Sequence, residues 1–182
     1  MRIIPTRLQE VLLVETDVHG DHRGFFTESY HRDRFTEAGI DCEFVQDNHS
    51  YSKEAGVLRG LHYQLEPMAQ SKLVRVVHGA IYDVAVDIRQ GSPTFGQWIG
   101  VILSADNMRQ LFVPKGFAHG FCTLVPNTHV LYKVDNYYSP RHDRGIAWND
   151  PRLAIDWPVR DPILSDKDRV HPLLEDAECL PL

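Results

Sequence analysis

Hydrophobic and polar residues alternate in several short segments of the chain. In segment 82–88, one face is apolar and the other carries Asp83 and Asp87. A period of two is the pattern of a strand with one buried face. The same pattern predicts further strands at 73–77, 98–103, 110–113 and 129–134. Turn residues separate such runs by about 8–12 residues, a spacing that is typical of a β-sandwich or a β-barrel.

Helical periodicity is scarce. The sequence predicts two turns of helix at 32–38, where Gly39 supplies a stop signal. Shorter helices are expected near 150–154 and 167–170. Segment 157–182 is rich in Pro and Asp, so we expect it to be loop-rich and packed on the barrel. The chain shows no repeat or linker, and its length predicts one domain over residues 1–182.

Composition narrows the class of partner. The chain has 182 residues, and 19 Lys and Arg against 25 Asp and Glu give a formal charge of −6. This acidic balance argues against a nucleic-acid polymer as partner, because such binding needs a basic face. It still allows a local basic pocket for a phosphorylated ligand.

The cysteines favour a reducing compartment. Cys42, Cys122 and Cys179 are odd in number, lie far apart and form no CxxC pair, so we expect free thiols. No apolar run approaches the ~18 residues that a membrane helix needs. The N-terminus also lacks the pattern of a signal peptide. We therefore expect a cytoplasmic protein with no membrane partner.

Two histidines lie in motifs that resemble those of the cupin superfamily. The stretch Pro114-x-Gly116-x-x-His119 resembles the second cupin motif, which turns between two strands and points its histidine into the barrel mouth. The stretch from Gly56 to His62 resembles the opening of the first motif.

The metal ligands of a cupin are incomplete in this chain. Gln64 and Lys72 stand where a metal-binding cupin has two further ligands. A lysine ammonium cannot ligate a divalent metal and would repel it, so we expect no metal. Lys72 would instead stabilise an oxyanion, and His62 would act as a base, since imidazole titrates close to neutral pH. This pair suits proton abstraction α to a ketone.

Other charged residues are weaker candidates. Arg23 and Arg59 offer forked donors that match phosphate oxygens, although a single arginine is most often a solvated surface charge. Asp83 and Asp87 are expected on a solvated face or as partners of arginines. Seven histidines have no motif around them and are expected to be surface or structural residues: His19, His22, His31, His78, His129, His142 and His171.

Several motifs together resemble one enzyme family. They include Asp21-x-Arg23-Gly24-x-Phe26-x-Glu28, Gln46-Asp47-Asn48, Arg59-Gly60-Leu61-His62, Gln70-x-Lys72, Pro114-x-Gly116-Phe117-x-His119, Tyr132, Tyr137-Tyr138 and Lys167-Asp168. In this order they resemble the dTDP-4-dehydrorhamnose 3,5-epimerase family, and the resemblance covers almost the entire chain.

The resemblance implies a mainly β, cupin-type jelly roll, a homodimer and a cofactor-free isomerase. It implies dTDP-4-dehydro-6-deoxy-D-glucose as the substrate, inverted at C3 and C5. His62 resembles the family's base and Asp168 its hydrogen-bonded partner. Tyr132 resembles the acid that returns a proton from the opposite face, and Lys72 the residue beside the C4 oxygen.

The resemblance also implies a set of substrate contacts. These are Arg23, Phe26, Glu28, Gln46, Asn48, Arg59, Lys72, His119, Asp143 and Lys167. Asp143 departs from the family, which often has Glu at this position. The presence of His62, Tyr132 and Lys72 argues against a non-catalytic sugar-binding cupin. An epimerase that inverts C5 or C3 alone and a metal-dependent cupin enzyme remain as alternatives.

Overall fold

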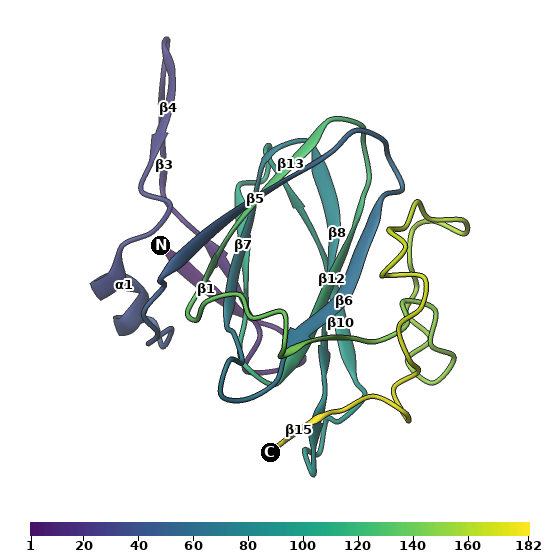
Figure 1. The fold of residues 1–182 in the computed structure, drawn as a ribbon. Coiled ribbons are helices and arrows are strands. Elements are labelled where there is room, and N and C mark those ends of the chain that lie inside the picture. The colour runs from purple at the N-terminus through teal and green to yellow at the C-terminus, as the bar shows by residue number, and fades with distance from the viewer.

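A computed structural model of residues 1–182 shows a barrel built from two antiparallel sheets that face each other (Figure 1). In spatial order, the six-stranded sheet contains β1 (Arg2–Pro5), β2 (Leu12–Glu15), β11 (Arg109–Val113), β7 (Lys72–His78), β13 (Thr128–Val134) and β5 (Gln46–Ser52). The five-stranded sheet contains β10 (Trp98–Ser104), β8 (Ala80–Asp87), β12 (Phe117–Thr123), β6 (Leu58–Gln64) and β14 (Asp143–Gly145). The predicted fold class, a mainly β jelly-roll barrel with little helix, is confirmed.

The local pattern located the strands well. All five predicted strands are present, and the first helix, α1 (Arg32–Glu37), falls within the predicted segment. The helices predicted near 150–154 and 167–170 are wrong, because both segments form turns. The Asp150 carboxylate accepts the backbone N–H groups of Arg152 and Leu153, at 2.7 and 3.1 Å. Side-chain bonds of this kind compete with a helical ladder.

Apolar side chains from both sheets fill the barrel. Fourteen buried residues form this core, among them Val74, Ala85 and Val130. A second core of fourteen residues lies on the outer face of the five-stranded sheet, where Val84 and Val86 pack with Trp157. The C-terminal segment therefore covers this sheet from outside, as its yellow trace shows in Figure 1.

The acidic face of β8 was expected to be solvated or paired with arginines, and the expectation of a solvated face is wrong. Asp83 and Asp87 are fully buried, not solvated, because the apolar face of β8 meets the C-terminal segment and the acidic face points into the barrel. Asp83 bonds His119. Asp87 does pair with an arginine, since Arg89 donates two hydrogen bonds to its carboxylate.

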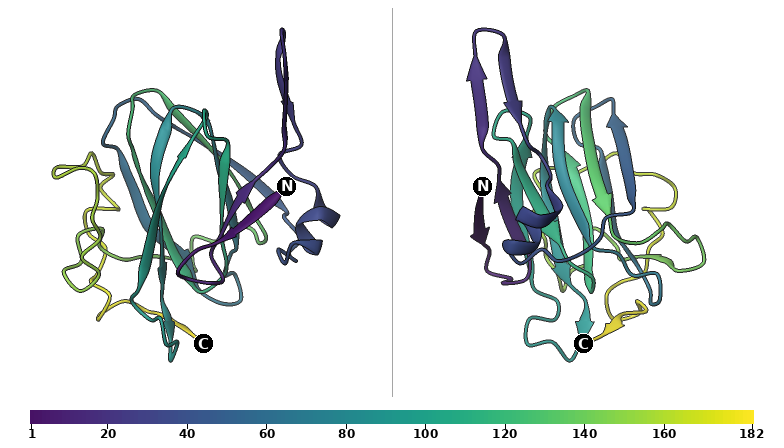
Figure 2. Two further views of the ribbon diagram at one scale, coloured as in Figure 1. Left: turned by 180° about the vertical axis from the view of Figure 1, so that it is seen from behind. Right: turned by 90° about the vertical axis from the view of Figure 1, so that its left-hand side faces the viewer.

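A hairpin projects beyond the barrel in every view (Figures 1 and 2). It consists of β3 (Val18–Asp21) and β4 (Gly24–Thr27). Phe25 and Phe26 on β4 are 61% and 70% exposed, which is unusual for two consecutive phenylalanines. The hairpin thus presents an apolar surface that this chain leaves uncovered.

The chain ends beside the barrel, where β15 (Leu180–Pro181) pairs with β9 (Arg89–Gln90) in parallel. The three cysteines are free, as expected. None of the helical structure has the length and apolar character that a membrane crossing requires.

Candidate active site

A cavity of about 330 Å³ lies at one end of the barrel. Its walls come from five strands and from two C-terminal segments. The lining residues are Gln46, Asn48, His62, Tyr63, Gln64, Gln70, Lys72, Tyr132, Tyr138, Asp143 and Lys167. The structure therefore brings together three of the four predicted catalytic side chains, and Asp168 lies directly behind them.

The backbone of β6 places His62. Gly60 has φ +115°, and a Cβ atom there would lie only 2.6 Å from the carbonyl oxygen of His119. Strands β6 and β12 thus approach too closely for any side chain, and their register shifts at this point. Beyond the shift, His62 stands opposite His119 on β12 and Gly145 on β14.

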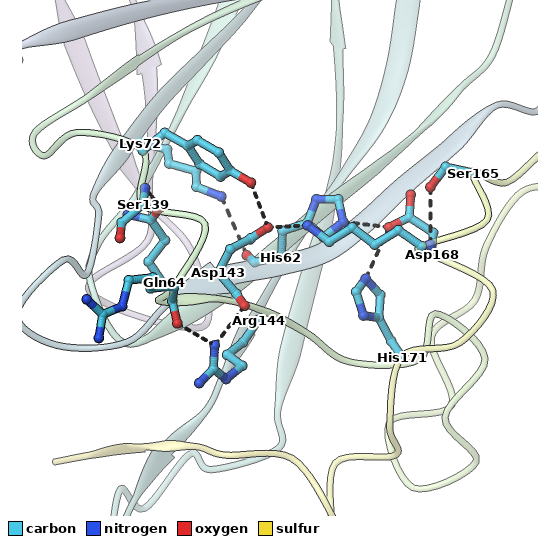
Figure 3. A network of polar contacts seen from close by, with 12 residues as sticks. His62, Gln64, Lys72, Ser139, Asp143, Arg144, Ser165, Asp168 and His171 are labelled. Atoms are coloured by element: carbon cyan, nitrogen blue, oxygen red, sulfur yellow. Dashed lines mark hydrogen bonds and ion pairs between the residues drawn. The ribbon is translucent and has the colours of Figure 1, made fainter.

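His62 and Asp168 form a hydrogen-bonded pair (Figure 3). The His62 Nε2 lies 2.5 Å from Oδ1 of Asp168, although 106 positions separate the two residues. Burial acts to raise the pKa of Asp168, but hydrogen bonds from His62 and Ser165 outweigh it, so this pKa lies below its usual range. An ionised carboxylate on Nε2 fixes the ring tautomer and leaves Nδ1 as the nitrogen that can accept a proton.

Tyr132 and Lys72 reach the same cavity from the neighbouring strands β13 and β7. Burial raises the pKa of Tyr132, so its phenol is protonated at neutral pH and can serve as an acid. Burial lowers the pKa of Lys72 to about 8, against the opposing effect of Asp143 and Asp83. Its ammonium group, 3.5 Å from the backbone oxygen of His62, still carries a charge at neutral pH.

The donor groups do not fit a cupin metal site. The Gln64 amide is already hydrogen-bonded to the backbone, because it donates to the carbonyl of Met68 and accepts the N–H of Ser139. Ligand-type atoms of His62, Asp168 and His171 lie within 4.8 Å of one another. However, the 2.5 Å between His62 and Asp168 suits a shared proton, whereas two ligands of one tetrahedral zinc stand about 3.3 Å apart.

The predicted substrate contacts divide into two groups. Gln46, Asn48, Lys72, Asp143 and Lys167 line the cavity. At its mouth, Asp143 accepts hydrogen bonds from both Lys167 and Tyr138.

The other predicted contacts lie outside the cavity lining. Arg23 and Phe26 are on the projecting hairpin and Glu28 follows it, where it pairs with Arg34. Arg59, near the start of β6, donates a hydrogen bond to the backbone oxygen of Tyr51. His119 is 6% exposed and bonds Asp83 at 2.7 Å.

Sequence reasoning assigned no role to several residues of this site. Gln70 and Tyr138 stand in motifs of the family resemblance, and Gln64 stands at a replaced metal-ligand position, which were the signals available for them. His171 was expected to be an ordinary structural histidine, yet it contacts Asp168. Its position three residues after Asp168 was the one indication.

A jelly-roll barrel with a histidine–carboxylate pair, a tyrosine and a buried lysine in its cavity defines a cupin-type isomerase. The dTDP-4-dehydrorhamnose 3,5-epimerase family model matches residues 5–176. The chain belongs to this family.

Individual relatives agree with the family match. The chain is 59% identical to dTDP-4-dehydrorhamnose 3,5-epimerase of Shigella flexneri, over 92% of this chain and 93% of the relative. A crystal structure of the Bacillus anthracis enzyme, with TDP and PPi bound, superposes with a TM-score of 0.93 and 62% identity, covering 94% of this chain and 98% of that one. The Legionella pneumophila RmlC structure, in complex with dTDP-4-keto-L-rhamnose, superposes with a TM-score of 0.94 and 52% sequence identity. The match covers 99% of this chain and 97% of that one.

Proposed function

We propose that this chain converts dTDP-4-dehydro-6-deoxy-D-glucose to dTDP-4-dehydro-L-rhamnose by inverting C3 and C5, a step of dTDP-L-rhamnose biosynthesis. The observation that carries the proposal is the convergence of the His62–Asp168 pair, Tyr132 and Lys72 on one cavity. A base, an acid and a cation are the groups that epimerisation beside a ketone requires.

The C4 ketone acidifies the hydrogens at C3 and C5. His62 Nδ1 takes one of these protons, and the C–H electron pair moves into the ring to give an enolate at O4. The Lys72 ammonium stabilises this oxyanion. Tyr132 then donates its proton to the opposite face of the carbon, which inverts the centre, and solvent returns both residues to their starting forms. The step has no net redox change, so the chemistry needs no cofactor.

The cavity mouth suits the polar parts of the substrate. Gln46 and Asn48 offer amide donors and acceptors for sugar hydroxyls, and their side chains already bond each other at 2.9 Å. Lys167 supplies positive charge for the diphosphate at the mouth, and Arg59 would add to it from outside the cavity lining, in a protein that is acidic as a whole. Asp143 bonds Lys167, which fixes the ammonium group at the mouth.

The buried charge of Lys72 gives a first prediction. Its pKa is about 8 in the folded protein against 10.5 ordinarily, so below pH 8 folding must bury an ammonium at a cost of about 3 kcal/mol. This penalty fades as the pH rises from 8 to 10.5, because the unfolded state then binds more protons. Lys72→Met should raise the free energy of unfolding at pH 7 by about 2 kcal/mol and lower kcat about 100-fold.

Urea denaturation at pH 7 and pH 10 tests the predicted change in the free energy of unfolding. The dependence of kcat on pH tests the predicted catalytic role of Lys72. Wild-type kcat should fall above pH 8 as Lys72 loses its charge, and the variant should lack that alkaline limb. A Lys72→Met enzyme that is less stable and fully active would contradict the role assigned to this cation.

A homodimer would bring two of the outlying predicted contacts, Arg23 and Phe26, to a cavity. Arg23 and Phe26 lie on a hairpin that projects beyond its own barrel. In a dimer, these two side chains could therefore contact the surface of the second subunit. We place the hairpin of one subunit at the cavity mouth of its partner, where Arg23 would meet phosphate and Phe26 an apolar ring of the substrate. Each subunit would consist of one domain, with segment 157–182 packed against the barrel. The free thiols favour a location in the cytoplasm.

Mixed dimers test this exchange. The double variant R23A/F26A keeps its own His62, whereas His62→Asn keeps its hairpin. Each homodimer should be nearly inactive, but mixed dimers should contain one complete site and regain about a quarter to a half of the wild-type kcat. Hairpins that served their own subunit would give no regain after mixing, and that outcome would contradict the exchange.

Product analysis separates the proposed reaction from its alternatives. Nuclear magnetic resonance of the product should show inverted configuration at both C3 and C5. Inversion at C5 alone, or at C3 alone, would identify a single-centre epimerase of a related sugar. Activity lost to a chelator and restored by a metal would identify a metal-dependent enzyme, and binding without turnover a non-catalytic cupin.

A further inference from the structure

The carboxylate of Asp168 faces two histidines. Its Oδ1 lies 2.5 Å from Nε2 of His62 and 3.2 Å from Nε2 of His171 (Figure 3). The His171 side chain is only 9% exposed and does not line the cavity. His171 thus lies outside the cavity, and we expect its effect on the reaction to pass through Asp168.

The surroundings of His171 hold its ring in place. Gly145 is the neighbour of His62 across β14 and β6, and a Cβ atom on Gly145 would overlap the His171 ring. The carbonyl of Pro172 accepts the N–H of Ala147 at 2.8 Å, which anchors the chain directly after the histidine. The His62 and His171 rings meet edge to face, with centroids 5.5 Å apart. The glycine at 145 thus provides the space that the second imidazole fills.

The protonation state follows from these neighbours. The titratable groups that act on His171 are His62, Asp168 and Lys167. Burial, and then the nearby His62, lower the pKa of His171, so the ring is neutral at neutral pH. A neutral imidazole has one N–H group, and an ionised carboxylate only accepts hydrogen bonds. The hydrogen of His171 therefore sits on Nε2 and is donated to Asp168.

We propose that His171 is a positioning residue, which fixes the Asp168 carboxylate so that His62 presents Nδ1 to the substrate. This inference rests on the proposed function, in which His62 is the base. With two donors on one oxygen, the carboxylate cannot turn without losing a hydrogen bond in a buried place. The second donor also shares the negative charge of Asp168, which would otherwise act on His62 alone.

Three substitutions separate hydrogen bonding from packing. His171→Gln places an amide N–H near the position of Nε2 and keeps the donor. His171→Asn is too short, since its amide reaches only the position of Nδ1. His171→Phe fills the space of the ring without a donor. We expect kcat to fall about 10-fold in the Asn and Phe variants with little change in KM, and to stay within about 3-fold of wild type in the Gln variant.

The pH profile supplies a readout that packing alone would not move. In His171→Phe, Asp168 directs its full charge to His62, so the acid limb of kcat/KM should move to higher pH by about half a unit. In His171→Gln the limb should stay in place. Circular dichroism and the melting temperature identify the folded fraction of each variant, so that rates are compared per folded site.

The outcomes distinguish this inference from the proposed function. If His62→Asn is inactive but His171→Phe has wild-type kcat and an unmoved acid limb, the positioning role alone is overturned. Equal losses in the Gln and Phe variants would also overturn it, because they would indicate packing only. A wild-type protein without epimerase activity, or an active His62→Asn, would overturn the proposed function and this inference with it.

Discussion

His62→Asn should abolish epimerisation, with kcat lower by about 10³-fold or more. The amide of asparagine has no lone pair that can accept a proton at neutral pH, so neither C3 nor C5 loses its hydrogen. Asparagine still fits on β6, where Gly60 allows the close approach to β12, and the fold should persist. Solvent hydrogen exchange at both carbons should disappear together with product.

The matched control is His31→Asn, because His31 is exposed and precedes α1 without a side-chain cap. Asparagine is favoured at such a position, so this variant should keep wild-type rate and stability. A His62→Asn enzyme that still exchanged C3 and C5 hydrogens would assign the base to another residue. The kinetic measurement is a coupled assay of product, with deuterium uptake followed by nuclear magnetic resonance.

Tyr132→Phe should separate proton removal from inversion. The His62–Asp168 pair is untouched, so the C–H bonds still break and the histidine returns a solvent-derived proton to the same face. Inversion needs a donor on the opposite face, and phenylalanine has none. Product formation should fall about 10²–10³-fold, while deuterium still enters the unconverted substrate.

The phenol's protonation supports this assignment, since burial raises the pKa of Tyr132 above its ordinary range and Arg59 opposes this only in part. In heavy water, the variant should therefore give deuterated substrate of unchanged configuration. Loss of exchange and inversion to the same extent would show that Tyr132 is needed before the C–H bond breaks, contrary to the two-face mechanism.

Much of the barrel could be predicted because the signals are local. Alternation marked the strands, and Gly39 marked the end of α1. Burial of Asp83 and Asp87 could not be predicted in this way. Both faces of β8 are covered, one by the opposite sheet and one by a segment some seventy positions further along the chain, and periodicity reports only the contrast between faces.

The site shows the same division between local and distant information. The motif around His62 and the replacement of ligands by Lys72 indicated proton chemistry from the residues themselves. The pairing of His62 with Asp168 came only from the family resemblance, because 106 positions separate the two residues. His171 was missed because its position three residues after Asp168 is a weak signal on its own. Arg23 and Phe26 are set apart from the cavity on a hairpin that projects beyond the barrel, and no local pattern in the sequence predicted this separation.

Conversion of dTDP-4-dehydro-6-deoxy-D-glucose by the wild-type protein in heavy water tests the proposed epimerisation itself. The product should have inverted configuration at C3 and C5 and one solvent deuterium at each of these carbons. Inversion without deuterium would exclude exchange through His62 and Tyr132. Substrate recovered with neither inversion nor deuterium would contradict the proposed reaction itself.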